Sequence, residues 1–320
     1  MKPWNTLPAV LLACAAVVAA DPPPAAAPTL VVVDSNGKEQ KLKSWKFVAG
    51  TRPLGWLAPA APAKEKDEKP ADKPAKPADA GPEAIEFRED KSPPLKQGVL
   101  TLLLPQHLRA LEYDSEKQTV TANIVLSEKA DGDLQLTGST GYVGINTITI
   151  EAEVDKGDAG IADVKYQAGV PKGVRAIRFP SPKPSGEDKG RPAFIALEYK
   201  KKKTSEDVFD LQPLYRLADK SERLLPTLPF KKTLKLDVSK MAHLVAVGYD
   251  GDDTECRVTT KDGEEQTYTL LKTTLIDGKV ATLEGLVGKI RGGYKLFPTE
   301  SWGDMHLDVQ FDEKKGDEKP

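Results

Sequence analysis

The sequence predicts a mainly β protein made of two tandem, internally duplicated antiparallel β-sandwich or small-barrel domains with one short helical insertion. Three observations lead to this fold class. Apolar and polar residues alternate along most of the chain, turn-forming residues separate these runs, and one strand-like phrase recurs in a preserved order. With 39% hydrophobic residues and 25 Gly among 320 residues, the composition is sufficient for a buried core.

The alternating segments predict individual strands. A hairpin is expected over 30–42, with its turn at Asn36-Gly37, and a second hairpin over 258–271. Between them, 119–125 and 147–154 alternate β-branched residues, which pack well on a pleated surface. We therefore expect antiparallel sheets with one buried face.

One segment has helical spacing instead. Over 210–225 the large apolar residues recur at intervals of three and four, and Pro213 would suit a first turn. Pro226 would end the segment. We expect a short helix here, within an insertion at about 204–229.

The recurring phrase consists of Ala, an aliphatic residue, any residue and an aromatic residue. It occurs at 84–87, 110–113, 176–179, 196–199 and 246–249, with a degraded sixth copy at 305–309. Because the order is preserved on both sides of a Pro-rich break, the phrase predicts duplication of a unit of roughly 100 residues. It also aligns His107 with His243, each directly before a strand.

Two charged, Pro-rich segments divide the chain. One is rich in Ala, Pro and Lys and lacks Leu, Ile, Val and aromatic residues, so it cannot bury enough apolar surface to become ordered. The predicted organisation is a signal peptide at 1–20, a hairpin and strand segment at 21–57, a disordered linker at 58–82, a first β domain at 83–180, a linker at 181–192, a second β domain at 193–311 and a disordered tail at 312–320.

The N-terminus indicates export. Residues 1–20 combine the positive Lys2, an apolar stretch over 7–18 and small residues before Asp21, as in a Sec signal peptide. Lipidation at Cys14 is the alternative, but the apolar stretch continues past that residue. We therefore expect a periplasmic, envelope or extracellular protein with no membrane span after cleavage.

The cysteine content and the net charge limit which reactive groups and which partners we expect. Removal of the signal peptide leaves Cys256 as the single thiol, and alternation places it on the same face as Val258, so we expect a buried, unreactive side chain. The formal net charge is −2, whereas a general nucleic-acid binder needs a cationic surplus to displace counterions. We expect no nucleic-acid partner.

No catalytic group, metal site or cofactor site is predicted. His107 and His243 are interpreted as residues that hydrogen-bond to the backbone where a strand begins. Asp250, Asp252 and Asp253 are weak candidates for a calcium loop, but Gly and Glu are missing from the positions where an EF-hand requires them, so an acidic turn is favoured.

The candidate ligand-binding residues are Trp302, Tyr294, Phe297 and Arg291, which could form a stacking surface for a polysaccharide or peptide. The alternative is that strand alternation buries the aromatic rings in the core. From these features we expect an exported, non-catalytic β-domain protein that binds an envelope component or a protein partner. A structural envelope protein, or a hydrolase whose carboxylates are scattered along the sequence, remains the alternative.

Overall fold

The computed structural model describes the chain from residue 29 to residue 312 with several gaps. The described residues are 29–58, 81–90, 99–127, 132–140, 146–155, 158, 160–170, 172–186, 189–199, 201–250, 253–303 and 306–312. The predicted signal peptide, most of the predicted linker at 58–82 and most of the predicted tail lie outside these residues. The described part is mainly β. Its antiparallel sheets do not close into a barrel, and it has no helix of seven or more residues. None of its helices is long and apolar enough to cross a membrane.

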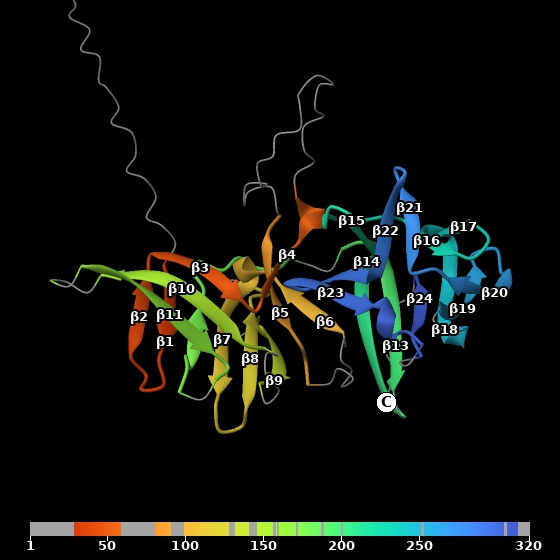
Figure 1. The fold of residues 1–320 in the computed structure, drawn as a ribbon. Coiled ribbons are helices and arrows are strands. Elements are labelled where there is room, and N and C mark those ends of the chain that lie inside the picture. The colour runs from red at the N-terminus through yellow and green to blue at the C-terminus, as the bar shows by residue number, and fades with distance from the viewer. Residues whose placement is uncertain are drawn as a thin grey trace, which may run out of the picture.

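Two packed sheets form the first half of the molecule, on the left in Figure 1. The larger sheet has the order β2 (Glu39–Leu42), β1 (Leu30–Val33), β12 (Ala176–Arg178), β7 (Leu108–Asp114), β8 (Thr119–Ile124) and β9 (Leu134–Ser139). The smaller has the order β11 (Ile161–Ala168), β10 (Ile148–Asp155) and β3 (Ser44–Ala49). Val32, Leu111 and Ile177 from one sheet share a buried core with Ile148 and Ile150 from the other. Burial of these aliphatic faces holds the two sheets together.

A fifteen-stranded sheet runs through the second half. Its order is β17 (Leu234–Asp237), β16 (Thr227–Phe230), β20 (Glu265–Leu270), β19 (Asp253–Thr260), β18 (Met241–Asp250), β24 (Asp308–Phe311), β13 (Pro192–Tyr199), β14 (Lys202–Leu217), β22 (Lys279–Ile290), β23 (Gly293–Pro298), β6 (Leu100–Leu103), β5 (Glu83–Phe87) and β4 (Thr51–Pro53). β15 (Glu222–Leu224) pairs with β14, and β21 (Thr273–Ile276) pairs with β22. Short 3-10 turns complete the described elements: η1 (Gly55–Leu57), η3 (Pro105–His107), η6 (Val238–Lys240) and η7 (Thr299–Ser301).

Six strands in each half have equivalent neighbours. The order β2-β1-β12-β7-β8-β9 in the first half has the counterpart β14-β13-β24-β18-β19-β20 in the second. In both halves a 3-10 turn precedes the central hairpin, which begins with a register shift at Leu108/Ala110 or Met241/His243. β14 corresponds to β2 and β3 together, because one part of it pairs with β13 and the rest with β22, the counterpart of β10.

The phrase-by-phrase duplication predicted from the sequence is not confirmed. The first copies, at Ala84 and Ala196, do not correspond, because β5 lies between β4 and β6 whereas β13 lies between β14 and β24. The register of the central hairpins also places Ala110, rather than His107, at the position of His243. The recurring phrase therefore reflects a common strand pattern. The equivalent strand order of the two halves is a separate observation.

The helix predicted over 210–225, in the insertion at about 204–229, is wrong. Strand β14 occupies most of this segment, and β15 and β16 follow it. Two register shifts, at Phe209/Gln212 and Leu214/Tyr215, interrupt the pairing of β14 with β22. Each shift changes which side chains face the core, so the buried positions depart from a period of two and imitate helical spacing.

The two halves are joined by pairing of β6 with β23, near the middle of Figure 1. On one face of this seam the ammonium of Lys295 lies 2.9 Å from Glu89 Oε1 and 3.0 Å from Glu206 Oε2. Thr101 donates a 3.0 Å hydrogen bond to Glu89 Oε1. Lys295 and Glu89 are only 3% and 4% exposed, so water scarcely solvates these charges. Each charge is stabilised by the oppositely charged group beside it. The predicted boundaries at 83–180 and 193–311 stay predictions, although β5 and β6 of the first range belong to this shared sheet.

The second half is closed by an ion-pair cluster at its last described residue. Arg191 forms two hydrogen bonds with the carboxylate of Asp312 and also donates to the carbonyls of Val238 and Met241. Lys261 Nζ lies 2.7 Å from Asp312 Oδ2. The hydrogen bond from Arg191, followed by that from Lys261, lowers the pKa of Asp312 from 3.8 to about 2. This cluster ties β24 to the start of β13.

Replacing Lys295 by Met should destabilise the protein strongly. The substitution keeps the length of the side chain but removes its charge from beside the buried carboxylate of Glu89 and the partly buried carboxylate of Glu206, a loss of about 3–5 kcal/mol. Guanidinium unfolding should show this loss. Lys289→Met is the matched control, because Lys289 is exposed on the neighbouring strand. Equal stability of the two variants would show that the buried cluster does not support the seam.

Acid should remove the contribution of Asp312. Because its pKa is lower in the folded chain than the ordinary 3.8, the stabilisation is present above that pH and disappears as the pH falls towards about 2. The melting temperatures of wild type and Asp312→Asn should therefore differ at pH 6 and converge near pH 2. Asp262→Asn, in the exposed β19–β20 turn, is the control. A difference that persists unchanged at pH 2 would contradict this assignment.

Candidate functional site

The four residues predicted to form a stacking surface do not share one. Trp302 and Phe297 are completely buried in the core of the second half, where Trp302 donates its indole N–H to the Phe297 carbonyl at 3.1 Å. Tyr294 lies on the opposite face of β23, half-buried, with its ring centroid 6.1 Å from that of Trp56. Arg291 is exposed in the β22–β23 turn. Strand alternation, the alternative interpretation of these aromatic residues, accounts for Phe297, whereas Trp302 enters the core from the turn that follows η7.

The histidines differ in their partners. His107 makes the predicted contact with the backbone, since its Nδ1 lies 2.9 Å from the Lys183 carbonyl oxygen. His243 instead pairs with a side chain, its Nε2 lying 2.7 Å from Asp308 Oδ1 on the neighbouring strand β24. In the described chain no Ser, Thr or Cys side chain hydrogen-bonds to His243, so the pair lacks the nucleophile of an acyl-transfer site.

The weak calcium candidate can be placed only in part. Asp252 and the side chain of Asp250 lie outside the described residues, and Asp253 lies 3.6 Å from Lys231 Nζ. No group of three His, Cys, Asp or Glu side chains within the described ranges could hold a metal ion.

Cys256 is the buried thiol that the sequence predicts. It is fully enclosed in the core of the second half, beside Val258 and Leu270. Burial, with a smaller contribution from Glu255, raises the pKa of the thiol to about 12. A thiol that stays protonated at neutral pH is a poor nucleophile and a poor metal ligand.

A hollow with a volume of about 1320 Å³ lies over the solvent-facing side of the first large sheet. A single row of cross-strand neighbours crosses its floor: Glu39, Val33, Ala176, Glu112 and Thr121, from β2, β1, β12, β7 and β8. These residues alternate with core residues along each strand. The alternation that buries one face of the sheet therefore presents this row on the other.

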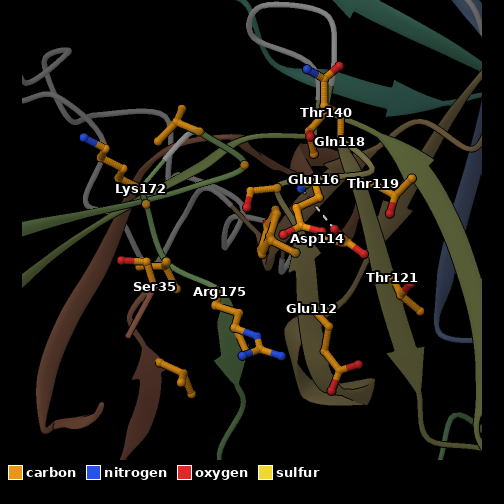
Figure 2. A pocket seen from close by; sticks show the side chains of 18 of the residues that line it. Ser35, Glu112, Asp114, Glu116, Gln118, Thr119, Thr121, Thr140, Lys172 and Arg175 are labelled. Carbon is orange, nitrogen blue, oxygen red and sulfur yellow. Dashed lines mark hydrogen bonds between the residues drawn. The ribbon is translucent and has the colours of Figure 1, made fainter. Parts of the chain in front are cut away.

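Turns from several parts of the chain surround the floor (Figure 2). In the β7–β8 turn, Asp114 accepts hydrogen bonds of 3.0 Å from the backbone N–H groups of Glu116 and Lys117. Lys117 also lies 3.2 Å from the same carboxylate. The backbone hydrogen bond from Lys117, and then its side chain, lower the pKa of Asp114. This residue is thus an ionised acceptor that fixes the turn.

Charges of both signs line the hollow. Asp114 pairs with Lys117, and Glu39 pairs with Arg178. Four further charged side chains line it without an ion-pair partner among the described residues: Glu112, Glu116, Lys172 and Arg175. Hydroxyl groups of Thr119, Thr121, Thr140 and Ser35 lie among them. The hollow therefore offers many donors and acceptors at fixed positions.

Tyr113 marks the inner edge of this hollow. Its backbone N–H donates a 2.7 Å hydrogen bond to the carbonyl of Arg175, which holds the β11–β12 connection against the sheet. Its hydroxyl is buried with no hydrogen-bond partner, and burial raises its pKa. Among the described residues, no exposed aromatic ring lines the hollow.

No protein-family model, curated protein or solved structure matches this chain. Functional assignment therefore depends on the geometry of its own residues.

Sequence reasoning missed the residues of this hollow. The alternation in 108–114 and 119–124 does indicate that Glu112, Thr119 and Thr121 face away from the core. The pairing of β12 between β1 and β7, however, brings Arg175 and Glu39 to the same place from distant segments. No local sequence pattern predicts that pairing.

Cys256 should not react with a thiol reagent in the native protein. Burial and a raised pKa keep the thiolate population negligible at pH 8. In a chain that lacks the predicted signal peptide, and with it Cys14, Ellman's reagent should label one thiol, and only after guanidinium is added. Rapid labelling of the folded protein would place Cys256 at the surface.

Proposed function

We propose that this chain is an exported, non-catalytic binding protein whose hollow over β1, β12, β7 and β8 holds a polysaccharide of the cell envelope. Its signal peptide, predicted over residues 1–20, is the basis for export. The single observation that carries the binding function is a sheet face that presents Glu39, Glu112 and Thr121 beside several turns, with four charged groups that have no ion-pair partner among the described residues.

The chemistry of the lining favours a hydroxyl-rich ligand. Carboxylate and guanidinium groups each form two directed hydrogen bonds, and Glu112 and Arg175 are free to do so with neighbouring hydroxyls of a sugar. A protein partner would need a buried apolar anchor. The exposed large hydrophobic residues of the described ranges lie elsewhere: Val48, Leu57, Ile161, Val247, Tyr249, Leu275 and Val280.

Asp114 is unsuited to acid catalysis. A glycosidase needs one carboxylic acid that stays protonated near neutral pH, through a raised pKa. Asp114 has the opposite environment, because Lys117 lowers its pKa. Asp114 is therefore not the proton donor that a hydrolase would need.

We further propose that the two halves arose by tandem duplication and then diverged on their outer faces. The support is the equivalent order of six strands in each half. At the positions of Glu112 and Ala176, the second half has Val245 and Asp308. The outer faces of the two halves therefore carry different residues at these positions.

Binding to purified envelope polysaccharides tests the proposal. Full-length mature protein should co-sediment with peptidoglycan sacculi or bind a soluble envelope glycan. The double variant Glu112→Gln and Arg175→Gln should weaken binding about tenfold or more, since it removes two charge-assisted contacts. Its matched control is Glu264→Gln with Arg257→Gln, two exposed residues of the second half.

The outcomes separate the alternatives. Loss of binding in the first variant but not in the control supports the hollow as the site. Equal binding by both variants rejects the hollow. Failure of the wild-type protein to bind any polysaccharide in the panel would contradict the binding function and favour a structural role.

A further inference from the structure

A second cavity lies at the seam between the two halves. Its volume is about 410 Å³, which is within the range of small-molecule sites. Its apolar floor is formed by Leu100, Leu296 and Pro298, from β6 and β23. It shares no residue with the hollow described above, so its assignment does not depend on the proposed function.

Four cationic side chains from distant segments line this cavity: Arg52, Arg88, Arg216 and Lys272. Two of them are fixed by carboxylates. Arg52 hydrogen-bonds to Glu222, and Arg216 donates a 3.1 Å hydrogen bond to Glu284. These two arginines are thereby braced in position rather than free to move away.

Arg88 and Lys272 have no such partner. Among the described residues, no carboxylate pairs with either side chain. The Nε of Arg88 is buried and lacks an acceptor, and burial lowers the pKa of this guanidinium. A buried guanidinium N–H without an acceptor is energetically unfavourable. The Nη groups of the partly buried Arg88 side chain make no hydrogen bond within the described chain, so they are the donors available to an anion in the cavity.

Two further orphaned polar atoms lie close to Arg52. The indole N–H of Trp56, whose ring centroid lies 6.0 Å from the Arg52 guanidinium carbon, is buried without a partner. Oε2 of Glu222, the carboxylate that pairs with Arg52, is buried and unpaired as well. Half of the unpaired buried side-chain atoms in the described chain thus cluster here: Trp56 Nε1, Arg88 Nε and Glu222 Oε2.

From this geometry we propose that the seam cavity binds a small organic acid, with its carboxylate between Arg88 and Lys272 and its apolar part on Leu100 and Leu296. A planar carboxylate can accept two hydrogen bonds from a guanidinium fork. Glu284 and Glu300 also line the cavity. Their negative charges oppose a phosphate dianion more than a carboxylate monoanion.

Titration with benzoate, benzamide and inorganic phosphate tests this proposal on the full-length mature protein. Benzoate should bind saturably by calorimetry or NMR. Benzamide has the same shape without the charge. Its affinity should be lower by a factor of about ten or more, because the charge-assisted hydrogen bonds are lost. Phosphate binding that is tighter than benzoate binding would overturn the choice of a carboxylate.

Substitutions locate the site. Arg88→Met should weaken benzoate binding about tenfold or more, and Lys272→Met about threefold. Arg223→Met is the matched control, since Arg223 is exposed, pairs with Asp277 and does not line the cavity. Benzoate affinity that is unchanged in both Arg88→Met and Lys272→Met would reject the cavity as the site.

Stability distinguishes a ligand-binding arginine from a structural one. Because the side chain of Arg88 has no hydrogen-bond or ion-pair partner in the described chain, Arg88→Met should melt at the same or a higher temperature than wild type without ligand. Benzoate should raise the melting temperature of wild type but not of this variant. A lower melting temperature for the unliganded variant would show that Arg88 serves the fold instead. Lys272 is exposed, so Lys272→Met provides a folded variant whatever Arg88→Met does.

Discussion

The pairing of β6 with β23 is the constraint on which the arrangement of this molecule depends. It continues the sheet of the second half into strands that precede the first half's central hairpin. The buried ammonium of Lys295 bridges Glu89, just after β5, and Glu206, on β14. Buried charges tolerate little displacement, because each lost contact leaves an uncompensated charge away from water. The seam is thus specified by polar contacts as well as by apolar packing.

Local alternation was sufficient to predict the class of fold. Strands such as β8 and β10 follow directly from β-branched residues at every second position. The segment around Pro213 was mispredicted because bulges in β14 move its buried positions out of step. The same cause limits any interpretation of a strand that changes partners along its length.

The candidate sites were harder to predict than the fold. An aromatic residue such as Trp302 gives the same sequence signal whether it lies in a core or in a binding surface, and here it fills the core. Arg88 and Lys272 meet only because long-range pairing assembles the seam, and the floor of the hollow similarly combines Glu39 with Glu112. Whether a charged side chain has a partner depends on its burial and on distances between residues far apart in the sequence. Both sites consist of polar groups that the fold holds in position but does not itself satisfy.

The position of β12 has a consequence for how the chain is made. β1 precedes the other strands of its sheet in the sequence, yet its partner β12 follows all of them. In the second half, β13 similarly pairs with β24, which comes after the other strands of the described sheet. The first large sheet therefore stays incomplete until β12 has been made, and non-local pairing of this kind is slow. Until then the edge of β1 that receives β12 is open. Glu39 and Lys41, charged residues of β2, discourage pairing at the opposite edge of the hairpin, which has no neighbouring strand in the described sheet.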